Sequence, residues 1–300
     1  MNEPRVTGSG PVVPRGLAER ARDISDGRLT PAVPRDAATV ILLRQAVDAG
    51  AGGVGFEAFL LRRTAELEFA PGAFVFPGGS VDASDADPGL GWAGPDPAEF
   101  AALLDVPPDR ARALVCAAVR ETFEESGVLL AGLANSSPAD LVCDSAALAA
   151  DRHALLTGSA SLGEVLGRRG LLLRADLLTP WARWITPEAS PRRFDTWFFA
   201  AVLPPGQTAT AAPEGFGDHA DPGESESGTW LAPAAALEAA QAGEITLLPP
   251  TAVTLGELAG HHDVAGIMAR RPVITPRLPK VIVEDGQARL AMPPPGEERP

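Results

Sequence analysis

The segment from Arg110 to Gly127 constrains the fold of this chain more than any other. Glu121, Glu124 and Glu125 lie near its end, and their i, i+3, i+4 spacing places them on one face of a helix. Like charges in this arrangement repel by a few tenths of a kcal/mol per pair. A divalent cation would reverse that sign, because Mg²⁺ prefers oxygen ligands. The pattern favours a metal-binding face, and a solvated acidic surface is the alternative.

The same segment predicts where that helix lies. Its apolar side chains recur with a helical period, which predicts a helix from Arg110 to Ser126, and Gly127 is typical of a helix C-terminus. The period is carried by Leu114, Val115, Ala118, Val119, Thr122 and Phe123.

A second feature lies upstream, where Phe74-Val75-Phe76-Pro77-Gly78-Gly79 predicts an extended segment that breaks into a tight turn at the two glycines. Gly78 and Gly79 lack a Cβ, so this backbone could approach a phosphate or a metal ion closely. An ordinary pair of loop glycines is the alternative.

Composition limits the classes of function. With 25 Lys and Arg against 39 Asp and Glu, the formal charge of −14 argues against a general nucleic-acid-binding or anionic-membrane-binding surface. Cys116 and Cys143 form no CxxC motif, so we expect small buried thiols and a reducing compartment. No apolar run approaches the ~18 residues of a membrane span, and no signal-peptide core follows Met1. The cytoplasm is the expected location.

The remaining pattern predicts an α/β protein with a mixed sheet between helices. Residues 1–35 are expected to be a flexible arm, 36–293 a single domain and 294–300 a disordered tail. Insertions are expected at about 86–108 and 134–170. Strands are expected at 37–44, 56–63, 181–187, 196–203 and 228–231. Helices are expected at 97–104, 162–169, 233–242 and 249–260. A hairpin is expected around Asp285-Gly286.

Two separated segments together resemble the Nudix box, whose pattern is Gly-x5-Glu-x7-Arg-Glu-U-x-Glu-Glu-x-Gly-U with U aliphatic. Gly79-x5-Asp85 corresponds to the first part and Arg120 to Val128 to the second. Thr122 replaces the first aliphatic residue, and Asp85 replaces the usual Glu. The gap from Asp85 to Arg120 holds 34 residues, 27 more than the pattern has. This divided box is similar to that of the Nudix branch containing the peroxisomal acyl-coenzyme A diphosphatases.

The preceding residues resemble the lead-in of coenzyme A-cleaving members of the family. That motif can be laid on Leu60, Leu61, Arg63, Thr64, Gly72, Phe76, Pro77, Gly78 and Gly79. Glu68 stands where the motif has its second Arg, and Phe59 where it has its first Leu. The resemblance implies substrate contacts by Arg63, Gly78, Gly79 and Phe76, although Phe76 and Phe74 also fit a hydrophobic core. Other candidate phosphate-binding arginines are Arg62, Arg192 and Arg193.

The resemblance also implies roles for the acidic residues. Glu121, Glu124 and Glu125 would hold Mg²⁺ or Mn²⁺, and Arg120 would pair with a carboxylate of the box and position it. Asp82 and Asp85 could reach the metal ions through water. Glu224 or Glu226 would supply a further ligand or the general base, with solvated loop carboxylates as the alternative. His219, in the same loop, is a weaker candidate.

The function that the resemblance implies is hydrolysis of a diphosphate bond in a nucleotide-linked substrate, foremost coenzyme A or its acyl esters. A Nudix hydrolase for NADH, ADP-ribose, a nucleotide sugar or a dinucleoside polyphosphate is one alternative. A catalytically silent nucleotide-sensing module is another. The expected partner is a small-molecule nucleotide, with neither nucleic acid nor membrane, and a homodimer stays open.

Overall fold

The computed structural model describes residues 10–46, 55–64, 71–134, 145–212, 225–284 and 287–292. Within these residues nine strands form one main sheet. They are β1 (Arg35–Gln45), β2 (Phe56–Arg63), β3 (Ala73–Val75), β4 (Gly78–Ser80), β8 (Thr179–Ile185), β9 (Phe194–Val202), β10 (Ser225–Leu231), β11 (Thr246–Leu247) and β12 (Pro276–Arg277).

The sheet is mixed, as predicted. Its order is β11-β3-β2-β1-β9-β8-β12, with β10 paired to β2 and β4 paired to β1. The central strand β1 runs parallel to β9 and antiparallel to β2 and β4. Residues 40–43 of β1 are fully buried, because helices cover both faces of the sheet and leave neither side of β1 in water.

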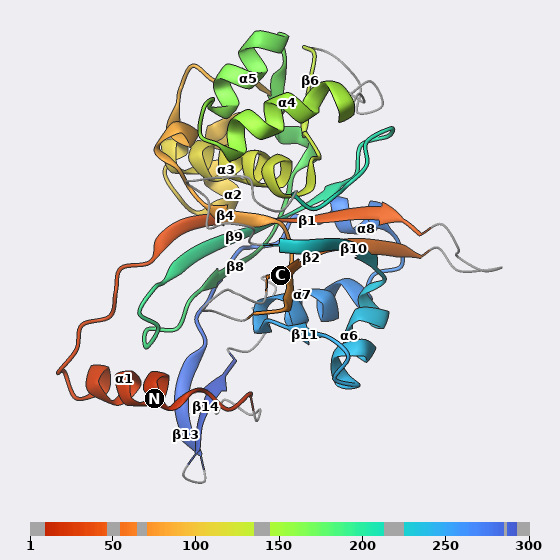
Figure 1. Cartoon of the computed structure of the whole chain (residues 1–300). Coiled ribbons are helices and arrows are strands. Elements are labelled where there is room, and N and C mark those ends of the chain that lie inside the picture. Colours follow the sequence, from red (N-terminus) through yellow and green to blue (C-terminus); the bar gives the residue numbers. More distant parts are fainter. Residues whose placement is uncertain are drawn as a thin grey trace.

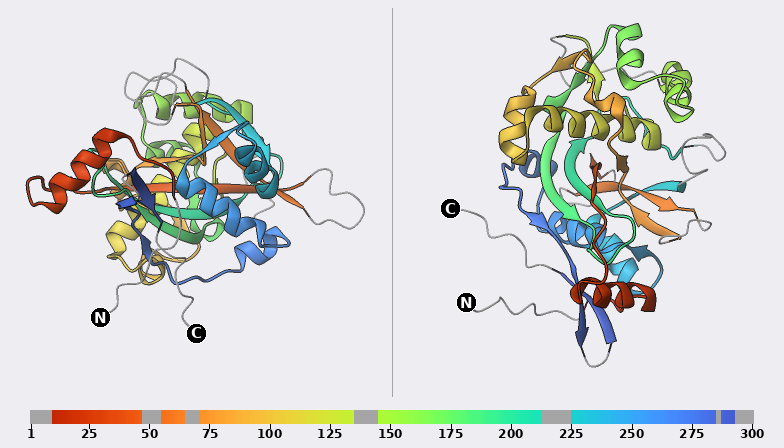
Figure 2. Two further views of the ribbon diagram at one scale, coloured as in Figure 1. Left: turned by 90° about the horizontal axis from the view of Figure 1, so that it is seen from below. Right: turned by 90° about the vertical axis from the view of Figure 1, so that its left-hand side faces the viewer.

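Each face of the sheet carries its own hydrophobic cluster. Val40 and Leu42 belong to the cluster under α3 (Pro108–Ser126), whereas Ile41 and Leu43 belong to the cluster on the opposite face. This division follows from the alternation of side chains along a strand. The opposite face is covered by α6 (Pro233–Gln241), α7 (Pro249–Ala259) and α8 (Val264–Met268) (Figures 1 and 2).

Helix α3 has the predicted end and begins two residues earlier than predicted. Pro108 occupies its first turn, where a missing N–H costs no hydrogen bond. Gly127 ends the helix with φ 71°, and its N–H donates to the Phe123 carbonyl at 2.9 Å. The helix is therefore fixed at both ends by residues with local conformational preferences.

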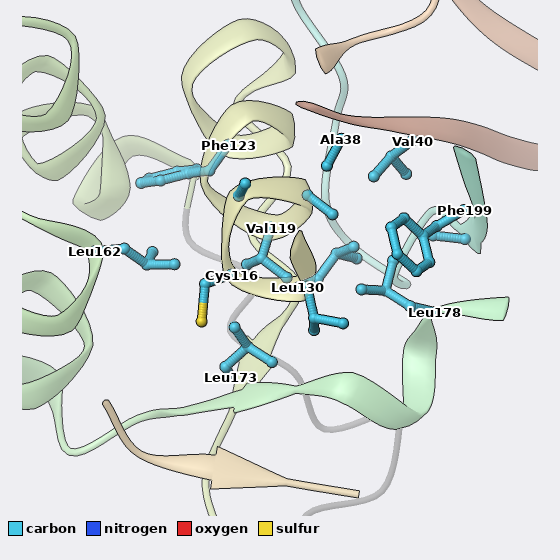
Figure 3. Packing of buried hydrophobic residues seen from close by; sticks show 14 of the residues in the cluster. Ala38, Val40, Cys116, Val119, Phe123, Leu130, Leu162, Leu173, Leu178 and Phe199 are labelled. Atoms are coloured by element: carbon cyan, nitrogen blue, oxygen red, sulfur yellow. The ribbon is translucent and has the colours of Figure 1, made fainter. Parts of the chain in front are cut away.

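The outer side of α3 is covered by the two predicted insertions (Figure 1). They contribute β5 (Trp92–Ala93), α2 (Pro97–Leu104), α4 (Ser145–Leu156) and α5 (Leu162–Arg169). The adjoining segments add the short helices η1 (Ala83–Ala86) and η3 (Ala175–Leu177) and the strands β6 (Ala131–Gly132) and β7 (Leu172–Arg174), and β7 pairs with β5 and β6 in a small sheet. Figure 3 shows Leu162 and Leu173 on one side of α3 and Val40 and Phe199 on the other. The helix is consequently buried on two sides, which explains why Cys116 is fully buried.

Part of the arm expected at residues 1–35 is helical and contacts the rest of the chain. Residues 15–25 form helix α1 (Arg15–Ser25), and Arg20 Nε donates to the Ala189 carbonyl at 2.9 Å. The preceding residues join the predicted hairpin of β13 (Lys280–Glu284) and β14 (Gln287–Ala291), since Val13 N donates to Ala288 O at 3.0 Å. These contacts are long-range, so the local Pro- and Arg-rich composition gave no sign of them. The hairpin turn 285–286 and the tail 294–300 lie outside the described residues.

Among the helices that the structure describes, none has both the length and the apolar character of a membrane span.

Candidate active site

Arg120 lies at the centre of the predicted site with its side chain 8% exposed. A guanidinium group has five N–H donors, and all five are used here. Nε and Nη2 donate to the two oxygens of Asp85 at 3.0 and 2.9 Å, and Nη2 also donates to Ser80 O at 2.9 Å. Nη1 donates to Glu121 Oε1 at 2.9 Å and to Glu124 Oε2 at 3.0 Å. Arg120 therefore positions carboxylates and has no N–H left for a substrate.

Asp85 brings the two halves of the divided box together. Its carboxylate is almost fully buried, and its two hydrogen bonds to Arg120 span 35 positions of the sequence. The short helix η1 presents it, because Asp82 caps that helix and the backbone N–H of Asp82 donates to Asp85 Oδ2 at 2.8 Å. Both oxygens of Asp85 accept hydrogen bonds from Arg120, so the observed role of this carboxylate is to hold Arg120 in place.

The glycine pair differs from the prediction in its conformation. Gly78 and Gly79 form no tight turn: they lie in β4, paired with Thr39 and Ala38 of β1. A Cβ on Gly78 would lie 2.4 Å from the Ala38 carbonyl oxygen, and one on Gly79 would lie 2.5 Å from Glu121 Oε1. Glycine is required here for close packing of β4 against β1 and α3.

Gly78 also binds the third glutamate. Its backbone N–H donates to Glu125 Oε2 at 2.7 Å. The glycine pair therefore lies against the acidic face of α3.

The electrostatics of the glutamates depend on their burial. Burial raises the pKa of Glu121 to about 8, with Arg120 opposing the shift and Glu124 adding to it. Burial likewise raises the pKa of Glu124, against the attraction of Arg120. Within the described ranges, no three carboxylate, imidazole or thiol groups are arranged to hold a metal ion. The side chains of Glu121 and Glu124 turn to Arg120, and that of Glu125 turns to Gly78.

The C-terminal end of α3 is fixed by a residue that sequence reasoning missed. Arg152 of α4 donates from Nε to the Glu124 carbonyl at 2.9 Å and from Nη2 to the Thr210 carbonyl at 3.0 Å. Burial lowers the pKa of Arg152 to about 10, and the nearby Glu125 opposes the shift. No local motif marks Arg152, because its partners lie 28 and 58 positions away.

The predicted substrate contacts have different surroundings. Arg63 follows Phe59 and Leu61 on the α3 side of β2 by strand alternation. Its Nε is buried and has no hydrogen-bond partner in the described part of the chain. Phe76 is a correction: it is 4% exposed and packs in the cluster on the opposite face, so the core alternative holds.

The structure places the remaining predicted residues in less detail. Arg193 donates to the carbonyls of Thr186 and Ala32, so it is a structural residue. Glu226 lies at an irregularity of β10, where the strand pairs with the end of β2. Glu224, His219 and Cys143 lie outside the described residues.

The divided box, the mixed sheet and the position of Gly78 and Gly79 in β4 are those of a Nudix protein, and comparison with known proteins agrees. The model of the NUDT19 Nudix domain family matches residues 96–258, more than half of the chain. The chain belongs to this Nudix family.

Particular relatives carry more specific names. The chain is 30% identical over 256 residues to the acyl-coenzyme A diphosphatase NUDT19 of Gallus gallus, covering 72% of this chain and 65% of that protein. It is 32% identical over 255 residues to the Homo sapiens protein of the same name, covering 71% and 63%. The match thus spans just under two thirds of the length of these relatives.

A solved structure supports the fold independently. The crystal structure of a Nudix hydrolase from Alicyclobacillus acidocaldarius superposes with a TM-score of 0.61 at 26% identity. The superposition covers 81% of this chain and 99% of the other. The predicted fold class is therefore confirmed.

Proposed function

We propose that this protein is a divalent-metal-dependent diphosphatase that hydrolyses the diphosphate bond of coenzyme A or its acyl esters. The observation that carries the proposal is the arrangement of the three glutamates of the Nudix box: Arg120 binds Glu121 and Glu124, Glu121 lies against Gly79, and Glu125 binds Gly78. The names of the vertebrate relatives support the choice of substrate.

The donor set suits a hard cation. Glu121, Glu124 and Glu125 supply only carboxylate oxygens, and burial raises the pKa of Glu121 and of Glu124. Glu124 and Glu125 would be the principal ligands of Mg²⁺ or Mn²⁺, with Glu121 as a ligand or an orienting partner. When bound, the ion would neutralise charge on the diphosphate oxygens and lower the pKa of an attacking water.

The chain's own residues hold this arrangement in place. Arg120 fixes the carboxylates of Glu121 and Glu124, and β4 lies directly against Glu121 without a side chain between them. We assign the general base to Glu224 or Glu226 on the strength of the family resemblance.

Arg63 is the proposed substrate contact on β2. Its buried Nε without a partner is a donor that a phosphate oxygen would satisfy. Arg63 also occupies the arginine position of the coenzyme A motif. Glu68, which replaces the second arginine of that motif, makes the substrate a question for experiment.

A product assay tests the proposal. The protein is incubated with Mn²⁺ or Mg²⁺ and coenzyme A, an acyl-coenzyme A, NADH, ADP-ribose or a diadenosine polyphosphate, and products are quantified by mass spectrometry. We expect the nucleoside 3′,5′-bisphosphate and phosphopantetheine, or its acyl form, as products. Faster turnover of NADH, ADP-ribose or the diadenosine polyphosphate than of coenzyme A would show that the protein has a different Nudix hydrolase activity. Binding of a nucleotide without any turnover would favour the silent module.

A matched variant tests the glutamates. Glu125→Gln keeps the size of the side chain and removes its charge, so turnover should fall by orders of magnitude while the circular dichroism spectrum stays unchanged. Wild-type turnover by this variant would refute the assignment of Glu125.

A further inference from the structure

We propose that Arg152 of the second insertion is a positioning residue that fixes the last turn of α3 and thereby the metal-binding glutamates. This inference rests on the proposed function and assigns a role to an insertion that the Nudix box itself does not include. It is carried by the contacts of Arg152 with two separate segments.

The first contact is with the helix end. The last four carbonyls of an α-helix lack partners within the helix, and in α3 these carbonyls belong to the turn that contains Glu124 and Glu125. Arg152 Nε donates to the Glu124 carbonyl at 2.9 Å. A cation at a helix C-terminus is also favoured by the helix dipole. Arg152 thus opposes fraying at the turn where the carboxylates must stay in place.

The second contact is with the loop that follows β9. Arg152 Nη2 donates to the Thr210 carbonyl at 3.0 Å, while the Thr210 N–H donates to the Ser126 carbonyl at 2.9 Å. Arg152 and Thr210 therefore cover two carbonyls of the last turn and are bound to each other. One guanidinium group joins the insertion, the helix end and this loop.

Close packing supports a fixed position for Arg152. A Cβ on Gly127 would lie 3.0 Å from Arg152 Nη1. The loop is held a second time by Gln207, which is 6% exposed and exchanges two hydrogen bonds with the backbone of Leu129 at 2.8 and 3.0 Å. Both neighbours of the guanidinium are therefore themselves fixed.

The test compares Arg152→Gln and Arg152→Lys with Arg168→Gln. Arg168 lies in the same insertion, its side chain is 57% exposed, and it pairs with Asp151 of α4, so its variant controls for loss of an arginine from the insertion. Mn²⁺ binding is measured by titration calorimetry without substrate, kcat and KM are measured on coenzyme A, and folding is checked by circular dichroism.

We expect Arg152→Gln to weaken Mn²⁺ binding and to lower kcat by about 10- to 100-fold each, the range for residues that orient metal ligands, with KM within about threefold. Arg152→Lys should recover part of the loss, because one ammonium group does not reproduce the planar fork. Arg168→Gln should match the wild type.

Two results would overturn the inference. One is wild-type Mn²⁺ affinity and kcat in Arg152→Gln; the other is an equal loss in Arg168→Gln. If Arg152→Gln does not fold, Arg152→Lys decides the question: weaker Mn²⁺ binding by a folded variant supports the inference, and unchanged binding refutes it. A wild type that binds Mn²⁺ but hydrolyses no substrate refutes the proposed function and leaves the binding comparison intact.

Discussion

At the scale of single residues, Arg120 converts a repulsive set of carboxylates into an ordered one. Its five donors meet Asp85, Glu121, Glu124 and a backbone carbonyl, all with little exposure to solvent. Removing one partner of a buried charge pair leaves the other charge uncompensated, which costs more than the pair itself contributes.

Asp85→Asn should therefore lower the free energy of unfolding by about 3–5 kcal/mol, the usual cost of breaking a buried pair. Urea denaturation measures the loss. Asp23→Asn is the control, because Asp23 pairs with Arg28 at the surface, where both side chains are more than 40% exposed, and such pairs contribute about 1 kcal/mol or less. Equal losses in the two variants would contradict the central role of Asp85.

Glu121 gives the site a pH-dependent stability. Its folded pKa of about 8 lies above its ordinary value of 4.5, so between these values the folded state binds more protons than the unfolded state. The metal-free protein should lose stability as pH rises through this window, at up to about 1.4 kcal/mol per pH unit for one proton.

Glu121→Gln removes this titration. With EDTA present, the variant should be no more stable than the wild type near pH 4.5 and should gain relative to it as pH rises towards 8. Thermal melting at several pH values measures the difference. A difference that stays constant across pH 5–8 would show that the carboxyl group of Glu121 is charged throughout.

At the scale of elements, the site depends on how closely β4 approaches α3. Gly79 is the contact point, because only a missing Cβ leaves room for the Glu121 carboxylate. The requirement is steric: neither glycine of β4 has a positive φ. A glycine within a β-strand often marks a place where another backbone or a ligand approaches closely.

Gly79→Ala should displace Glu121, lower turnover at least tenfold and destabilise the fold by about 1–3 kcal/mol, as overpacking does. Gly167→Ala is the matched control, since a Cβ on Gly167 meets nothing within 4 Å and alanine favours a helix by about 1 kcal/mol. Enzyme kinetics and thermal melting measure both variants. Normal turnover in Gly79→Ala would mean that Glu121 has room to move without loss.

At the scale of the whole molecule, residues 11–13 pair with β14 below the main sheet (Figure 1). Val13 N and Leu290 N donate to Ala288 O and Pro11 O, both at 3.0 Å. The site lies on the other face, against α3, and among the described residues its hydrogen bonds do not reach this terminal unit.

Deleting residues 1–13 should therefore speed hydrogen exchange at Leu290 and leave the amide of Val40, which donates to Pro77 at 2.8 Å, protected as in the full chain. Hydrogen-exchange mass spectrometry measures both. Loss of protection at Val40 would show that the arm is part of the cooperative core. Turnover on coenzyme A should stay near that of the full chain.

The sequence predicted those parts that depend on neighbouring residues. The apolar period and Gly127 defined α3, and the helices expected at 97–104 and 162–169 have the observed bounds of α2 and α5. The spacing of Glu121, Glu124 and Glu125 indicated the acidic face. The cytoplasmic location, the metal ions and the dimer stay predictions.

The same reasoning failed where a contact spans a long stretch of chain. Gly78-Gly79 resembled a turn because turn signals are local, and the true constraint came from Ala38 and Glu121. Phe76 matched a substrate motif, and only the sheet showed that its side chain lies on the face away from α3.

The sequence by itself determined the helix that carries the three glutamates, because helix period, caps and charge spacing act over a few residues. Tertiary structure alone decided how the divided box closes. Asp85 reaches Arg120 across 35 positions, and Arg152 reaches the helix end across 28. Such contacts form only when the packed sheet and insertions hold both partners in place, so no local pattern encodes them.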